Sequence, residues 1–554
     1  MKAVTCFIGI GTLAAVAAFA QAPSPPAAPQ APAPPPFGPP VGPGRTLQTS
    51  DMTNSNPLIP VDLYRSGSVS HQDLATFAWL EFISAVSPSA AGSRGIPGGS
   101  FAASGNGSPT PLTWETYQHR TELFPCNVSG GSSAVTPPQP WGSAPRYVTT
   151  VLNSNPQLCS TITLSGASLP YNNLDEATQI GQNSLFFPAT PGKPQPATDP
   201  QVLFEAKANQ YESDYVARNY TTLLPKFGPF HFSPGITLPA GTVEVKAAWR
   251  PLASIPAAQR YRYYTTTVLA YGGTDGAPVP QRLPYALIAL HIIHKTPNYP
   301  AFTFATFEQV DDFQNQVTGS PSGVYYVPTY GSVGYQLPAT TKLPPSGTTV
   351  ANPNIGFSTT NPQAKPYGTG PVSLPLGAVS GIPGASKVNG AVVVPVTQPV
   401  PIVPEVAQAN RNALAAMQGI PGFGPNFIWQ YYRLAGVQAI PTNDETTRDF
   451  YLANIVVESS QPGIQLFRGF PPILNGVLTN MRNQANVIDY HNSPASITSS
   501  GGCQGCHGVA QTQNGFDFSF LFFGVAGGGF SPETTGLTSK SAAAVRLKAK
   551  RYFR

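Results

Sequence analysis

The sequence predicts an α+β protein, built as one large proline- and glycine-rich globular unit with an antiparallel sheet and a few helices. Of its 554 residues, 53 are glycine and 63 are proline, a composition that favours turns and extended segments over long helices. Apolar residues make up 41% of the chain, enough to bury a large core. The hydrophobic period also changes along the chain, from the spacing typical of helices to the alternation typical of strands.

Residues 1–20, MKAVTCFIGIGTLAAVAAFA, are expected to be a secretory signal peptide. Lys2 precedes an apolar run that ends in small residues around Ala20, as in cleaved signals. Cys6 lies inside the apolar run rather than at its end, which argues against a lipid-anchored cysteine. No later apolar run reaches the roughly 18 residues needed to span a bilayer. We therefore expect an exported protein, periplasmic or secreted, with no transmembrane segment in its mature chain.

Four further parts are expected after the signal peptide. Residues 21–56 begin with a tract of proline and alanine and are predicted to form a polyproline-like tether. Residues 57–480 are predicted to form the main globular domain. Residues 481–535 carry two closely spaced cysteines and are expected to pack on this domain, and residues 536–554 form a basic tail.

Three stretches have the periodicity of helices. Residues 70–86 place apolar side chains on one face behind Ser70, a good N-cap residue, which predicts an early core helix. Residues 199–223 and residues 404–419 are predicted to form the other two helices. The last of them leads into residues 426–440, which are predicted to form a strand.

Strands are expected from residue 242 onward. Residues 242–250 and 260–271 alternate and are rich in β-branched and aromatic side chains, which predicts two strands of one sheet. A further strand is expected within residues 285–313, where His291 and His294 lie in an apolar run. On a strand the two histidines face opposite sides, and only a helix would bring both to one metal. His294 ends the apolar run, where a neutral imidazole can be held in one orientation and can face a docked C-terminal segment.

Two cysteines and a histidine near the C-terminus, in Cys503-Gln504-Gly505-Cys506-His507, have the spacing CxxCH. This is the attachment motif of a c-type haem, in which two thiols bind the porphyrin and the adjoining imidazole becomes the proximal ligand of the iron. A zinc site would need further cysteine or histidine ligands, and none follows His507. A thioredoxin-like pair would lie near a βαβ pattern, whereas this motif lies in a stretch rich in glycine and serine. The motif therefore predicts one covalent haem c.

The sequence does not determine which residue, if any, is the ligand at the sixth coordination position of the iron. Common class I cytochromes have a methionine ligand well after the motif, and here no methionine follows Met481. A four-helix cytochrome bundle does not suit the proline and glycine content. With His507 as the proximal ligand, the candidates for the distal ligand are His294 as first choice, His291, Met481 and His491, or no protein ligand at all.

Cys126 and Cys159 are expected to form a disulfide. Of the five cysteines, Cys6 is removed with the signal peptide and two bind haem, so these two remain. In an oxidising compartment such a pair is expected to be bridged. The alternative is a pair of free buried thiols.

Several segments resemble the exported single-haem proteins that bacterial genomes describe as cytochrome c family proteins. The matching segments are FAWLEFISAV (77–86), PLTWETYQ (111–118), VEVKAAWR (243–250), LHIIHKTPNYPAFTFATFEQVDD (290–312), and GCQGCHGVAQ with DFSFLF (502–522). The resemblance implies one continuous globular unit with the haem segment near its end, and it implies no particular activity. Over residues 480–500, which hold Met481 and His491, the chain departs from the shorter acidic-aromatic helix of that family.

The formal net charge of +5 is concentrated at the C-terminus. Six positive residues lie among the last fifteen: Lys540, Arg546, Lys548, Lys550, Arg551 and Arg554. No basic stripe interleaves with stacking aromatics in the rest of the chain, so nucleic acid is not an expected partner. The tail suits an acidic partner or an anionic surface, and the alternative is a frayed end with no partner.

The leading hypothesis from these features is an electron-transfer protein, more a carrier than an enzyme, that works with a redox partner protein. The chain is much longer than one haem requires, which motivates an alternative: a haem enzyme or small-ligand sensor with an open sixth position. Its pocket would include His294, His291 and Trp249. A third hypothesis is a surface or matrix module in which the haem is incidental.

Overall fold

The structure is a computed structural model of the chain. It describes residues 34–65, 69–108, 110–125, 136–151, 158–176, 184–186, 200–223, 236–274, 277–312, 325–327, 386–388, 391–395, 404–439, 517 and 519–522. From Pro34 onward these residues belong to one compact unit. The predicted signal peptide and basic tail lie outside the described residues.

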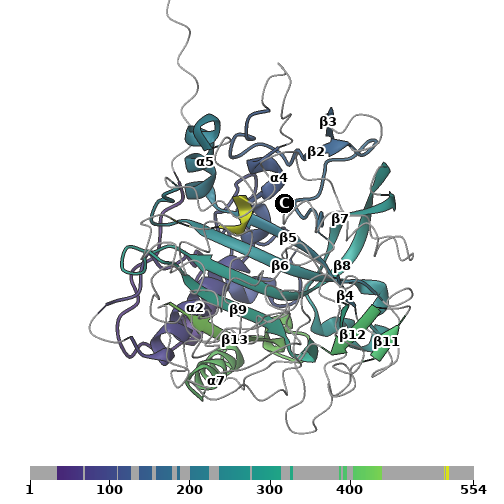
Figure 1. Cartoon of the computed structure of the whole chain (residues 1–554). Coiled ribbons are helices and arrows are strands. Elements are labelled where there is room, and N and C mark those ends of the chain that lie inside the picture. Colours follow the sequence, from purple (N-terminus) through teal and green to yellow (C-terminus); the bar gives the residue numbers. More distant parts are fainter. Residues whose placement is uncertain are drawn as a thin grey trace, which may run out of the picture. The chain divides into compact units, whose positions relative to one another are not determined.

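An antiparallel sheet of seven strands forms the centre of the fold (Figure 1), which confirms the α+β class. Its strands lie in the order β1 (Gln118–His119), β5 (Leu203–Ala208), β6 (Val243–Pro251), β8 (Ala277–His294), β9 (Thr303–Gln309) and β13 (Tyr432–Gln438), and β7 (Thr265–Thr274) pairs with β8. The long strand β8 pairs with β7 along its first part and with β6 and β9 along its second part. The two predicted strands near residues 242 and 260 therefore do lie in one sheet.

The register of β8 assigns its side chains to two faces of the sheet, because successive side chains alternate. His294 pairs with Val243 of β6, whereas its neighbour Ile293 pairs with Glu244 of β6 and Phe304 of β9. Val243 belongs to the core that packs against α2, while Ile293 and Phe304 belong to a second apolar cluster that packs against α5. We name these sides the α2 face, which carries His294, and the α5 face, which carries Ile293.

Two helices, α2 (His71–Ala85) and α7 (Pro404–Gln418), cover the α2 face (Figure 1), and both were predicted from the sequence. The hydroxyl of Ser70 accepts a hydrogen bond from the backbone N–H of Asp73 at 3.1 Å, so Ser70 caps α2 as expected. Phe82 of α2 stacks on Phe307 of β9 with ring centroids 4.1 Å apart. Aromatic packing thus joins the helix to the sheet.

The α5 face is covered by α5 (Gln210–Leu223) and by the described residues of the C-terminal segment. Val216 and Tyr220 of α5 pack against Phe124, whose ring centroid also lies 4.9 Å from that of Phe522. The apolar side chains near the end of the chain therefore complete a cluster that begins on the sheet.

The single helix predicted over residues 199–223 is wrong in its first half, because Leu203–Ala208 form β5. Glu205 and Lys207 gave this stretch a polar, helix-like pattern. In the structure both are fully buried in the sheet, where each has polar partners. Pairing of β5 with β6 therefore overrides the local helix propensity.

The tether predicted over residues 21–56 is too long, since the globular unit begins at Pro34. Val41 and Met52 are fully buried in the core, and α1 occupies Thr49–Thr53. The proline-rich composition of this stretch concealed a few apolar residues that are enough to fix it on the domain.

The remaining elements are short. Two are α-helices, α3 (Phe101–Ser104) and α4 (Arg120–Leu123). The 3₁₀ helices are η1 (Trp114–Thr116), η3 (Leu252–Ser254), η4 (Ala257–Arg262), η5 (Val310–Asp312), η7 (Ile428–Tyr431) and η10 (Phe520–Phe522). A second sheet contains β11 (Ser386–Val388), β12 (Ala391–Pro395), β10 (Tyr325–Val327) and β4 (Ser184–Phe186), and β2 (Val148–Val151) pairs with β3 (Leu158–Thr161). No helix among the described residues is long and apolar enough to cross a bilayer.

Candidate functional site

Most of the predicted site residues lie outside the described part of the chain. They are Cys503, Cys506 and His507 of the motif, together with Met481, His491 and Cys126. Cys159 lies in β3 opposite Thr150 of β2, and its side chain is not described, so the disulfide stays a prediction. The structure does describe His291, His294 and Trp249.

His294 is fully buried at the end of β8 and faces α2. Its Nδ1 lies 2.7 Å from Oε1 of Glu81, which α2 projects onto the sheet. The rings of Phe37 and Phe77 lie nearly parallel to the imidazole, with centroids 5.7 and 5.9 Å away. The other ring nitrogen, Nε2, is buried and has no hydrogen bond partner among the described residues.

This environment suits an imidazole that binds a metal through Nε2. Histidine ligands commonly donate the other ring N–H to a carboxylate, which fixes the tautomer and orientation of the ring. When Nδ1–H of His294 donates to Glu81, the free lone pair lies on Nε2. A metal ion approaches in the plane of the ring, a direction that parallel stacked rings do not occupy. A buried nitrogen without a partner costs roughly 1–3 kcal/mol, and a bound metal would remove that cost.

Burial raises the pKa of the Glu81 carboxyl, and the hydrogen bond with His294 opposes that rise. Both side chains are at least 99% buried, Glu81 with 1% and His294 with 0% exposure. The pair therefore lies in a dry site, where the tautomer of the imidazole decides which ring nitrogen of His294 carries the lone pair.

His291 faces the opposite side, as the strand prediction requires. Its Nδ1 lies 2.6 Å from the hydroxyl oxygen of Thr306, its cross-strand partner on β9. Its ring centroid is 5.9 Å from that of Phe304. The two histidines therefore do not converge on one metal. Trp249 pairs with Leu287, toward the other end of β6 from His294, so the three residues of the predicted pocket are not brought together.

Asp517 anchors the C-terminal segment, whose Leu521 and Phe522 belong to the apolar cluster of the α5 face. Its backbone N–H donates to the carbonyl of Ile236 at 2.9 Å. Its Oδ2 accepts hydrogen bonds from the backbone N–H of Leu238 and from Nζ of Lys295, both at 2.6 Å. Asp517 is 1% exposed and Lys295 5% exposed, so this ion pair is buried.

Nine residues, 508–516, lie between His507 and Asp517 in the sequence. Lys295 directly follows His294, but consecutive side chains of an extended segment face opposite sides. The described part of the C-terminal segment therefore docks on the face opposite His294, which differs from the expectation that His294 faces it.

Two buried glutamates lie beside this anchor, Glu212 of α5 and Glu244 of β6, with 0% and 4% exposure. Burial raises the pKa of Glu244 to about 7. Burial, and then the charge of Glu244, raise the pKa of Glu212 well above its usual value. Burial also raises the pKa of Asp517, which Lys295 opposes. At neutral pH this group therefore binds protons instead of carrying three negative charges.

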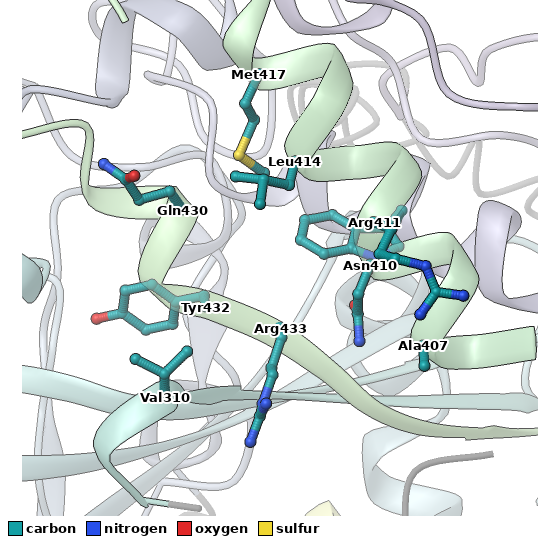
Figure 2. A pocket seen from close by; sticks show the side chains of 10 residues that line it. Val310, Ala407, Asn410, Arg411, Leu414, Met417, Gln430, Tyr432 and Arg433 are labelled. Carbon is teal, nitrogen blue, oxygen red and sulfur yellow. Dashed lines mark hydrogen bonds between the residues drawn. The ribbon is translucent and has the colours of Figure 1, made fainter. Parts of the chain in front are cut away.

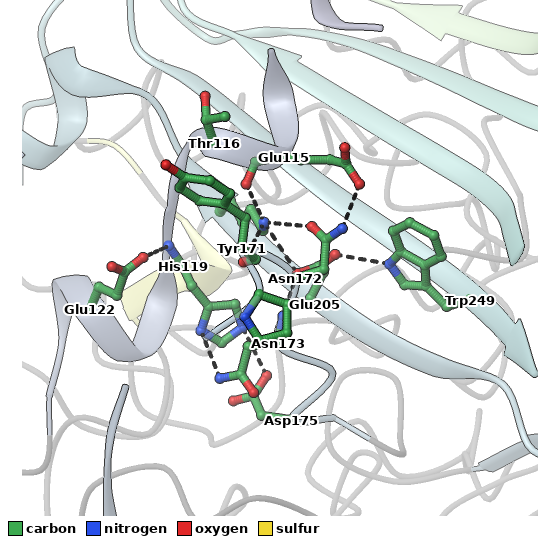
Figure 3. Close-up of polar contacts among 12 residues, drawn as sticks. Glu115, Thr116, His119, Glu122, Tyr171, Asn172, Asn173, Asp175, Glu205 and Trp249 are labelled. Atoms are coloured by element: carbon green, nitrogen blue, oxygen red, sulfur yellow. Dashed lines mark hydrogen bonds and ion pairs between the residues drawn. The ribbon is translucent and has the colours of Figure 1, made fainter. Parts of the chain in front are cut away.

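A second buried polar network lies where β1 and β5 meet the loop at residues 171–176 (Figure 3). Nζ of Lys207 donates to the carbonyls of Glu115 and Tyr171 at 2.6 and 2.9 Å, and to Oδ1 of Asn172 at 2.8 Å. Burial lowers the pKa of Lys207, and the carboxylate of Glu205, 3.4 Å away, opposes that fall. The ammonium group is thus enclosed by acceptors.

The same network continues through His119, whose Nε2 lies 3.1 Å from Oδ1 of Asp175 (Figure 3). Two N–H groups of Arg120 donate to Oδ2 of Asp175 at 2.9 and 2.7 Å. Burial alone would raise the pKa of Asp175, but Arg120 and His119 hold it well below its usual range. Each charged group here has an opposite charge beside it. We therefore infer that the network stabilises this part of the sheet.

Sequence reasoning missed Glu81, Glu212 and Glu244. A signal was present for Glu81, because a glutamate inside the apolar run FAWLEF must be buried with the helix and needs a partner. No local signal marks the contact between Glu212 and Glu244, since they come from different elements and meet only in the fold. Among the described residues, no group of three histidine, cysteine or acidic side chains has a geometry that could hold a metal ion.

No protein-family model, no curated protein and no solved structure matches this chain.

Proposed function

We propose that this protein is an exported mono-haem c-type cytochrome that exchanges single electrons with a partner protein. The observation that carries the proposal is the CxxCH motif at Cys503, Cys506 and His507. A haem bound there would supply the redox chemistry, since its iron takes up and releases one electron. The remaining tasks fall to the chain: attachment by the two thiols, ligation by imidazole, and burial.

His294 is the distal ligand that the described residues support best. Its Nε2 is buried and unpaired, and Glu81 fixes the ring through Nδ1. His294 ends β8, and the anchor of the C-terminal segment at Asp517 lies on the other face of the sheet. In this proposal the imidazoles of His507 and His294 would hold the haem iron.

One observation favours the alternative, a haem enzyme or small-ligand sensor with an open sixth position. The described C-terminal residues dock on the face of His291, and His291 already has Thr306 as its hydrogen bond partner. A haem held wholly on that face would find no unpaired histidine among the described residues, and its sixth position would stay available to an external ligand.

Visible spectra of the ferric and ferrous protein, with and without carbon monoxide, separate the two functions. The carrier proposal expects a low-spin haem that resists carbon monoxide. His294→Ala should then give a high-spin ferric spectrum and a ferrous form that binds carbon monoxide, while the matched variant His291→Ala should keep the wild-type spectrum. A wild-type protein that binds carbon monoxide would support the alternative instead. An unchanged low-spin spectrum of His294→Ala would transfer the ligand role to Met481 or His491.

Export to an oxidising compartment is part of the proposal, and the disulfide between Cys126 and Cys159 follows from it. The bridge would close a loop of about thirty residues and stabilise the fold by about 3 kcal/mol. Peptide mapping without reductant should find the two cysteines in one linked peptide. Two thiols that react with an alkylating agent in the native protein would exclude the bridge.

The basic tail of residues 540–554 is proposed to meet an acidic partner or surface. Deleting it should weaken association with the redox partner at low salt and remove most of the salt dependence. Equal salt dependence in the truncated and full-length proteins would contradict a role for the tail.

A further inference from the structure

A pocket of about 310 Å³ lies between α7 and β13, beside the edge of the sheet (Figure 2). Ligand sites in proteins have volumes of about 300–1,000 Å³, so this pocket can hold a small molecule. Its lining comes from α2, η5, α7, η7 and β13, and the side chains that matter most are Trp79, Leu414, Met417, Tyr432, Arg411 and Arg433. None of them belongs to the proposed haem site.

The walls of the pocket are mainly apolar. Leu414 and Met417 project from α7 toward Tyr432 across the pocket (Figure 2), and Trp79 of α2 also contributes. Leu414 is 38% exposed, which is unusual for a large apolar side chain among the described residues. A bound apolar group would cover Leu414 and gain the corresponding hydrophobic stabilisation.

The pocket is fixed in shape by Asn410 of α7. Its Oδ1 accepts hydrogen bonds from Nε1 of Trp79 at 3.1 Å and from the backbone N–H of Leu434 at 3.0 Å. Its Nδ2 donates to the carbonyl of Leu434 at 2.9 Å. One side chain thus ties α7 to α2 and to β13, so a ligand would not have to order the walls as it binds.

Positive charge is in excess at the pocket. Arg411 donates to Oε1 of Gln408 through Nε and Nη2, at 3.1 and 2.5 Å, and this partner is neutral. Burial lowers the pKa of Arg433, and the nearby charge of Glu308 opposes that fall. Arg411 therefore has a neutral partner and no carboxylate partner among the described residues.

We propose that this pocket binds a small carboxylate with an apolar body. The planar fork of a guanidinium group matches a carboxylate through two parallel hydrogen bonds, which Arg411 can offer at the pocket. The apolar body would lie against Trp79, Leu414 and Met417. The pocket would thus recognise an aromatic or short aliphatic acid, a binding activity distinct from electron transfer.

Three probes separate the charged contact from the apolar contact. Benzoate has a ring and a charge, benzamide has the same ring without the charge, and acetate has the charge without a ring. Titration calorimetry on the full-length exported protein should give the tightest binding for benzoate. One charge-assisted hydrogen bond contributes enough for about a tenfold preference over benzamide. Acetate should bind too weakly to saturate.

Two variants locate the site. Arg411→Gln should weaken benzoate about tenfold and leave benzamide unchanged, because only the charged contact is removed. Leu414→Glu places a negative charge at the mouth and should abolish benzoate binding. The control Arg218→Gln removes an exposed arginine of α5, on the other face of the sheet, and should have no effect.

Three outcomes would overturn the proposal: no saturable binding of benzoate, equal affinity for benzamide and benzoate, or wild-type benzoate affinity in both Arg411→Gln and Leu414→Glu. Because both substituted side chains are exposed, the variants should fold, and circular dichroism checks that they do. Failure here leaves the haem proposal untouched, since the visible spectrum reports on that proposal separately.

Discussion

On the α2 face of the sheet, the rings of Trp79, Phe82 and Phe307 pack on one another, with centroids 4.1–5.5 Å apart. On the α5 face, by contrast, buried ionisable side chains gather around the end of the chain. Glu212 and Glu244 lie there with the ion pair that Lys295 forms with Asp517. The aromatic cluster of the α2 face and the acidic group of the α5 face thus bury very different chemistry.

This difference indicates which part of the fold has a stability that depends on pH. Stacked aromatic rings gain from burial whatever the proton concentration. Buried carboxyls change charge with pH, and those of the α5 face lie beside Asp517, the anchor of the C-terminal segment. We therefore expect the aromatic cluster of the α2 face to stabilise the domain independently of pH, and the acidic side chains beside the anchor of the C-terminal segment on the α5 face to respond to pH.

The largest expected effect is on the α2 face. Phe82→Ala removes a ring that contacts Trp79, Phe307 and Trp429, and it should lower the free energy of unfolding by about 3–5 kcal/mol. The loss should be the same at pH 5.5 and pH 8, measured by urea denaturation. Leu414→Ala, at an exposed position, serves as the control and should cost much less. A loss for Phe82→Ala that varies with pH would break the contrast between the faces.

The next effect tests the anchor on the α5 face. Asp517→Asn leaves Lys295 buried without its counter-charge, which should cost about 3 kcal/mol. Limited proteolysis should then cut the C-terminal segment faster than in the wild type. As a control, Arg45→Gln breaks a partly exposed ion pair with Asp51 and should cost less than about 1 kcal/mol. Equal cleavage rates in Asp517→Asn and the wild type would show that the anchor does not hold the segment.

The pH dependence of the α5 face has a definite sign. Glu244 keeps its proton in the folded protein up to pH about 7, whereas the unfolded chain releases it near the ordinary value of 4.5. The folded state therefore binds more protons in this window, and its stability should fall as the pH rises through it. The raised pKa values of Glu212 and Asp517 act in the same direction.

Glu244→Gln tests this sign, because glutamine keeps the shape and cannot ionise. In the variant, the free energy of unfolding should decline less between pH 5 and pH 8 than in the wild type. At pH 8 it should be higher than that of the wild type by on the order of 2 kcal/mol. Unfolding curves at the two pH values measure both quantities. Asp311→Asn, at a half-exposed carboxyl, should leave the decline unchanged. A wild-type free energy of unfolding that rises from pH 5 to pH 8 would contradict the raised pKa values of Glu212 and Glu244.

The smallest effect concerns the start of α2. Ser70→Ala removes the hydroxyl that accepts the N–H of Asp73, and loss of such a cap should cost about 1 kcal/mol. Ser70→Asp keeps an acceptor at the cap and should restore most of that stability. Equal loss in both variants would show that the hydroxyl has another role than capping.

Local features of the sequence were enough to predict α2 with its cap at Ser70, the helix α7, and the opposite facing of His291 and His294. Each depends on spacing along one element. The strand β5 was not predicted, because its polar residues become acceptable only when partners from distant segments enclose them. The unpaired Nε2 of His294 could not be predicted either, since it depends on what surrounds the ring in three dimensions.

The central claim is covalent attachment of one haem at Cys503 and Cys506, and the mass of the denatured full-length exported protein tests it most directly. We expect the exported chain to be heavier by one haem and to keep its colour after extraction with acidified acetone. The variant Cys503→Ala/Cys506→Ala should have the bare mass and lose its colour on extraction. A wild-type protein with the bare mass, or a haem that extracts freely from it, would contradict the assignment as a c-type cytochrome.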